Sequence, residues 1–235
     1  MKPAQNRGLV RILIDSGVWL ALCASSLLVA AARSMGVPAG WDLIAVTALG
    51  TMGVYGFDRW IVRRAGKPWW ILAVVAAAGI GLTLPVAAIR ILGGVCVLAL
   101  VHHWLREVPW FKPVYISLAW LGVVVGLPWV IRGDGPIPGA ALPIALAIVA
   151  NALACDAVDR EAEAAQIGPR RVWWIARVVA GLGVVAGWPH PAAAVPAAML
   201  LAMVRWPVTR RRAEWVLDGA LLVGGAGAIA LGGVS

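Results

Sequence analysis

The chain has 235 residues, of which 62% are hydrophobic and 13% charged, and its net charge at pH 7 is +9. So few charges cannot cover the surface of a water-soluble domain, and several apolar runs have membrane-spanning length, so a soluble globular class is excluded. We therefore expect an integral membrane protein. The excess cations are dispersed over several segments, which indicates membrane topology and no nucleic-acid partner.

Apolar runs bounded by charges, proline or glycine predict nine transmembrane helices in one polytopic domain over residues 1–235. The expected fold is therefore an all-α membrane protein. The fourth and eighth runs are short for a hydrocarbon core of about 30 Å. In chain order, the expected spans are 13–32, 42–62, 69–89, 91–105, 114–131, 139–156, 172–188, 191–206 and 215–234.

Lysine and arginine near helix ends are retained on the cytoplasmic side of a membrane. With a cytoplasmic N-terminus, seventeen of the twenty cations fall inside and only Arg33, Arg90 and Arg132 fall outside. This bias predicts a multi-pass protein of the cell inner membrane with its C-terminus outside. The inner cations are Lys2, Arg7, Arg11, Arg59, Arg63, Arg64, Lys67, Arg106, Lys112, Arg160, Arg170, Arg171, Arg177, Arg205, Arg210, Arg211 and Arg212.

The first predicted helix also imitates a cleaved signal peptide. Residues 2–34 have a basic start, an apolar middle and a tail of small residues. We expect this segment to be retained, because Asp15 interrupts it and its removal would invert the charge bias.

The segment CDAVDREAE, which begins at Cys155, leaves the end of the sixth predicted helix on the cytoplasmic side. At about 100° per residue, Asp156, Asp159 and Glu163 share one helical face, while Glu161 points elsewhere. Such a stripe of carboxylates suits Mg²⁺, which takes hard oxygen ligands and often shares them with phosphate. The alternative is a solvated turn of mixed charge.

Two cytoplasmic segments resemble one another. DRWIVRRAGKPWWI begins at Asp58 after the second helix, and DREAEAAQIGPRRVWWI begins at Asp159 after the sixth. Both continue from Asp-Arg through basic residues and a proline to Trp-Trp-Ile. They lie four helices apart and therefore emerge on the same face, as expected of a weak parallel repeat. We expect Asp58 to approach the Asp156–Glu163 face across a shared polar cavity.

With nine helices and these two loops, the chain resembles the UbiA superfamily of intramembrane prenyltransferases, whose two Asp-rich motifs follow helices two and six. CDAVDREAE is similar to the second motif, NDIxDxEGD, and places Asp156, Asp159, Glu161 and Glu163 on its acidic positions. Residues 111–128, FKPVYISLAWLGVVVGLP, resemble the fifth-helix region of less-characterised members. The first motif, N-x3-D-x3-D, is depleted, since Val54 and Val62 flank Asp58 at the positions of its Asn and last Asp.

The resemblance implies an isoprenoid transfer from a prenyl diphosphate to a hydrophobic aromatic, quinone-precursor or tetrapyrrole-like acceptor. Cations would neutralise the leaving diphosphate. The implied Mg²⁺ ligands are Asp58, Asp156, Asp159 and Glu163. The implied diphosphate ligands are Arg59, Arg63, Lys67, Arg106, Lys112 and Arg170.

Whether the chain is an enzyme stays open at this point, because the first motif keeps a single carboxylate. The main alternative is a noncatalytic UbiA-like subunit that binds lipid, quinone or pigment within a larger membrane complex. A transporter is a third interpretation. Two further features are expected to be structural: Asp218 to reach the interface or pair with an arginine, and most tryptophans, Trp173 and Trp174 among them, to anchor helix ends in the headgroup region.

The charge bias generates a topology prediction. Reporter fusions should place the N-terminus and the segments 58–68, 106–112, 157–171 and 207–214 in the cytoplasm, with the C-terminus outside. Alkaline phosphatase and fluorescent-protein fusions at these sites provide the measurement. A cytoplasmic C-terminus would mean an even number of spans and contradict the nine-helix prediction.

Overall fold

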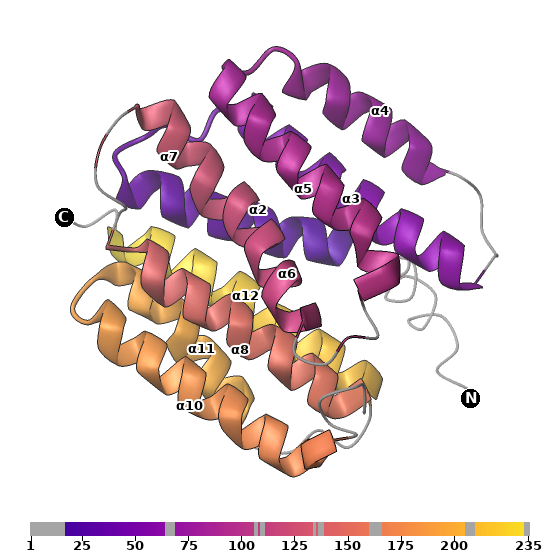
Figure 1. The fold of residues 1–235 in the computed structure, drawn as a ribbon. Helices are drawn as coiled ribbons and strands as arrows, with labels where there is room; N and C mark the ends of the chain where they lie inside the picture. Colours follow the sequence, from indigo (N-terminus) through magenta and orange to yellow (C-terminus); the bar gives the residue numbers. More distant parts are fainter. Residues whose placement is uncertain are drawn as a thin grey trace, which may run out of the picture.

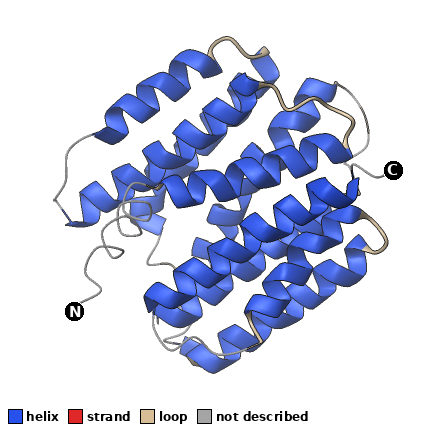
Figure 2. Ribbon diagram, turned by 180° about the vertical axis from the view of Figure 1, so that it is seen from behind, coloured by secondary structure: helices blue, strands red, loops and turns tan. Residues whose placement is uncertain are grey.

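The computed structural model describes residues 17–63, 69–105, 108, 111–133, 135, 139–159, 166–204 and 210–232. Within these ranges the chain forms helices and turns but no β-strand (Figure 2), which confirms the all-α class. The described residues form nine continuous helical segments. They are α2 (Val18–Ser34), α3 (Trp41–Arg63), α4 (Trp69–Gly81), α5 (Val86–Leu105), α6 (Phe111–Leu121) continued by the π-helix η1 (Gly122–Gly126) and α7 (Leu127–Arg132), α8 (Ala141–Asp159), α10 (Pro169–Gly187), the 3-10 helix η2 (Pro191–Ala193) continued by α11 (Ala194–Ala202), and α12 (Arg210–Gly232).

Several segments have the length and composition of membrane-crossing helices. Among the described residues, three are long and apolar enough to span a membrane: Phe111–Arg132, Ala141–Val158 and Trp215–Gly232. The shorter apolar helices are Val18–Ser34, Trp69–Gly81, Val86–Val101 and Pro191–Ala202. These helices indicate membrane association, and the number of spans stays a prediction.

The expected break between the third and fourth helices is wrong. We expected helices over 69–89 and 91–105 with the break at Arg90, but α5 begins at Val86. Pro85 precedes this start, and a proline favours a helix beginning because it has no backbone N–H to donate. Arg90 is exposed on α5, where its long side chain leaves the helix undisturbed.

The helix ends beside the acidic motif also differ from the expectation. We expected spans over 139–156 and 172–188, whereas α8 continues to Asp159 and α10 begins at Pro169. The connection between the two helices is therefore shorter than the sequence indicated. Asp159 consequently belongs to the last turn of α8, and Asp156, which the expected span already contained, lies one turn before it.

Successive segments run in opposite directions through the bundle (Figure 1). Each segment packs against the next, and α12 packs back against α2, so the nine segments close into a ring. We call the end of the bundle at which α2 begins the N-terminal end. The ends of α3, α5, α8 and α11 and the starts of α4, α6, α10 and α12 lie at this end (Figure 1). The end of α12 lies at the opposite end, as an odd number of antiparallel segments requires.

Two cores of buried side chains hold the ring together. The larger core joins α2, η1, α8, α10, α11 and α12, and it contains Leu27 of α2. The smaller core joins α2, α3, α4, α5 and α7, and it contains the next residue, Leu28. Because consecutive helical residues point about 100° apart, α2 supplies side chains to both cores at the same level.

Glycines allow η1 to approach α5 closely. A Cβ atom at Gly122 would lie 3.2 Å from Val95 of α5, and one at Gly126 would lie 3.2 Å from Ile91. Small residues at this four-residue spacing are typical of helix pairs packed inside membranes, where close contact is the main attraction.

Gly224 of α12 provides a test of this packing. A Cβ atom at Gly224 would lie 2.6 Å from the Cα atom of Val195, whereas one at Gly227 would lie 3.6 Å from the Cβ atom of Ala194. We expect Gly224→Ala to lower the free energy of unfolding by about 1–3 kcal/mol, because the backbone of α11 or α12 must move to make room for the added methyl group. Gly227→Ala should be neutral or stabilising by up to about 1 kcal/mol. Unfolding in detergent, followed by tryptophan fluorescence, measures both. Equal stability of the two variants would contradict the close approach.

Candidate functional site

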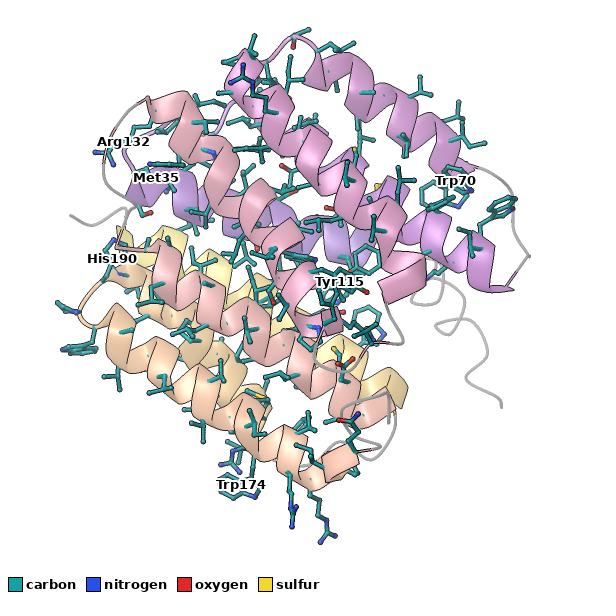
Figure 3. All side chains as sticks on the ribbon, in the orientation of Figure 1. Met35, Trp70, Tyr115, Arg132, Trp174 and His190 are labelled. Atoms are coloured by element: carbon teal, nitrogen blue, oxygen red, sulfur yellow. The ribbon has the colours of Figure 1, made fainter. Side chains whose placement is uncertain are left out.

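Two predicted site residues meet at the N-terminal end of the bundle. Lys112 lies in the first turn of α6, and Asp156 lies one turn before the end of α8. The Lys112 Nζ atom donates a hydrogen bond to Asp156 Oδ1 over 2.8 Å. The Asp156 side chain is 1% exposed and that of Lys112 is 17% exposed, so the ion pair is largely withdrawn from solvent. Tyr115, one turn further along α6, is also buried at this end (Figure 3).

Each charge of this pair would be unfavourable without the other, because of where it lies on its helix. A helix has a partial positive charge at its N-terminus and a partial negative charge at its C-terminus. Lys112 lies at the positive end of α6, and Asp156 lies near the negative end of α8. Neither charge is favoured by its own helix, and both are desolvated. Their mutual attraction therefore holds the two helix ends together, and loss of one partner leaves a buried charge.

The structure places the other predicted ligands in three ways. Asp58 and Arg59 are partly buried near the end of α3. Arg170 is exposed in the first turn of α10. The remaining predicted ligands have side chains outside the described residues: Arg63, Lys67, Arg106, Asp159 and Glu163.

The described carboxylates do not by themselves form a Mg²⁺ site. Within the part of the chain that the structure describes, no three His, Cys, Asp or Glu side chains gather closely enough to hold a metal ion. One oxygen of Asp156 already accepts a hydrogen bond from the Lys112 ammonium. A metal at the predicted position would need the side chains of Asp159 and Glu163, which lie outside the described residues.

A second polar cluster lies inside the bundle and was missed by sequence reasoning. We expected Asp218 to reach the interface or pair with an arginine, but its side chain is buried on α12. The Asn151 amide donates a hydrogen bond to Asp218 Oδ1 over 3.3 Å, and the Cys23 thiol donates to the Asp218 carbonyl oxygen over 3.1 Å. These contacts join α2, α8 and α12 at one residue, Asp218.

Tyr55 of α3 faces the same cluster. It lies within electrostatic range of Asp218, and its side chain is hydrogen-bonded to that of Trp120 on α6. The inward position of Asp218 follows from the face of α12 that the structure buries. Asp218 and Leu221 are three positions apart and so share a helical face, and Leu221 is fully buried. The acid therefore belongs to the core-facing stripe of α12.

Comparison of the chain with protein-family models, with curated proteins and with solved structures gave no match.

The Lys112–Asp156 pair can be tested by a double-mutant cycle. Lys112→Met should lower the free energy of unfolding by about 2 kcal/mol, because it leaves the Asp156 carboxylate buried beside an apolar side chain. Adding Asp156→Asn should recover most of this loss. Unfolding in detergent measures all four proteins, with Arg132→Met as the control at an exposed arginine. Strict additivity of the two substitutions would contradict a coupled pair.

Proposed function

We propose that the chain is a membrane protein with nine spans and a UbiA-like arrangement, and that it binds a prenyl diphosphate at the N-terminal end of the bundle. In this proposal it acts as a prenyltransferase in the cell inner membrane, with that end facing the cytoplasm. A hydrophobic acceptor and membrane lipids are its other partners. The charge bias and the antiparallel course of the nine described helical segments support this placement.

The observation that carries the proposal is the contact between Lys112 and Asp156. The resemblance assigns Lys112 to the diphosphate and Asp156 to the metal, and these two residues are 44 positions apart in the sequence. Their contact supports a shared site between α6 and α8. An ammonium beside a carboxylate is also suited to exchange, because a diphosphate oxygen can replace Asp156 as its hydrogen-bond acceptor.

The roles of the chain's own residues follow from this exchange. Lys112 would neutralise one diphosphate oxygen, and Arg59 of α3 would contribute a second cation from across the ring. Mg²⁺ would supply the remaining neutralisation of the leaving group, with Asp58, Asp156, Asp159 and Glu163 as its proposed ligands. The apolar helices would enclose the isoprenoid tail.

A specific observation favours the noncatalytic alternative. Val54, which takes the Asn position of the first motif, is exposed on α3. Its apolar side chain offers no ligand atom on the face of α3 that it shares with Asp58, four positions further along. A UbiA-like subunit that binds lipid, quinone or pigment without catalysis needs no carboxylate or amide there.

A substitution at Asp159 distinguishes the prenyltransferase from the noncatalytic subunit. Asp159→Asn should weaken Mg²⁺-dependent binding of geranylgeranyl diphosphate at least 10-fold, about 1.4 kcal/mol, because it removes a ligand charge with little change in shape. We choose Asp159 because Asp156→Asn would also break the ion pair with Lys112. Binding to the purified protein, measured with Mg²⁺ and with chelator, provides the readout.

The control is Asp42→Asn, which removes an exposed acid from the first turn of α3 at the opposite end of the bundle. It should leave binding unchanged. If the folded protein binds no prenyl diphosphate under either condition, the prenyltransferase proposal fails and the noncatalytic subunit replaces it. If binding depends on Mg²⁺ but turnover is absent, Val54→Asn combined with Val62→Asp should restore some activity.

A further inference from the structure

The outer face of α10 carries a group of arginines at the N-terminal end of the bundle. Arg170 and Arg171 are exposed in the first turn of the helix, and Arg177 lies two turns further along. We call these three residues the α10 arginine cluster. Trp174 lies between them, is 61% exposed and projects outward from the bundle (Figure 3). The Arg177 guanidinium carbon lies 4.6 Å from the centre of the Trp174 ring.

The electrostatics of this cluster are unfavourable without an anion. The N-terminus of a helix has a partial positive charge, and the first turn of α10 contains arginines but no acidic residue. No carboxylate among the described residues pairs with any of the three arginines. The Arg177 Nε atom is buried and has no hydrogen-bond partner within the described chain. Arginine presents a planar set of donors that matches phosphate oxygens, so the exposed Arg170 and Arg171 and the accessible donors of Arg177 suit an anionic oxygen ligand.

An apolar stripe continues from Arg171 and Trp174 along one face of α10, and Arg170 and Arg177 lie beside this face. Val178, Leu182 and Val185 are all exposed, and with Arg171 and Trp174 they lie within about 80° of the helix circumference. A tryptophan between cations and an exposed apolar stripe is typical of the boundary between lipid headgroups and acyl chains. A free phosphate ion would contact only the arginines, whereas a phospholipid would contact both the arginines and the apolar stripe.

We propose that the α10 arginine cluster binds the phosphate group of an anionic phospholipid, with Trp174 at headgroup level and an acyl chain along Val178, Leu182 and Val185. This inference rests on the membrane placement proposed above but not on prenyl diphosphate binding. Arg177 is the central donor, because its cation–π contact with Trp174 orients the guanidinium before the lipid arrives.

The test uses the full-length protein with Arg171→Gln and Arg177→Gln combined, since neither residue belongs to the predicted diphosphate set. We expect phosphatidylglycerol, titrated into the protein in a neutral detergent, to bind the native chain more tightly than phosphatidylcholine. The double variant should bind phosphatidylglycerol at least 10-fold more weakly. Arg132→Gln, at an exposed arginine on the opposite end, should keep the native affinity. Native mass spectrometry of the lipid adducts measures each affinity.

Additional variants and ligands distinguish the possible results of this experiment. Arg177→Lys should bind more weakly than the native chain but more tightly than Arg177→Gln alone, because it keeps the charge and loses the planar donors. These single variants also serve if the double variant does not fold. Equal loss in Arg132→Gln, or unchanged affinity in the double variant, overturns the proposal. Binding of glycerol phosphate with the same affinity shows a free-phosphate site and overturns the lipid assignment. Geranylgeranyl diphosphate binding, measured on the same variants, should stay unchanged.

Discussion

The position of α2 between the two cores is the constraint on which the rest of the bundle depends. Leu27 and Leu28 are both fully buried, one in each core. In the proposed membrane placement the hydrophobic effect does not drive helices together, so close packing and internal hydrogen bonds determine the arrangement. A helix enclosed on two sides fixes how far α3 can lie from α12. The closure of the ring between the first and last described helices follows from this position.

Hydrogen bonds between segments that are distant in the sequence determine how α8 is oriented within this packing. Asn151 and Asp156, little more than one turn apart on α8, contact Asp218 of α12 and Lys112 of α6. α8 is thereby fixed on two sides by polar contacts, in addition to its apolar contacts with α10 and α11. A buried polar contact tolerates only a narrow range of distances, so these two bonds specify the rotation of α8 about its own axis.

The nine helical segments could be predicted from the sequence because apolar runs of sufficient length have few alternatives. The sequence predicts a break at Arg90, because a charge inside an apolar run resembles a helix boundary. The structure has the break at Pro85, and the long side chain of Arg90 reaches out of the bundle. The candidate site was predictable only in composition. Nothing local to Lys112 or Asp156 indicates that they touch, and the inward position of Asp218 depends on which face of α12 meets α8. The π-helix at Gly122–Gly126 has no pattern of its own in the sequence.

The contact between α6 and α8 has a consequence for how the chain is made. A ribosome delivers α6 before α8, and these are consecutive segments of the bundle. When the second half of α8 leaves the translation machinery, Lys112 is already present to receive Asp156. In the proposed membrane placement, the acid can therefore enter the apolar layer as half of a neutral pair. Lys112 then offsets the cost of burying Asp156 during insertion, before the later helices are made.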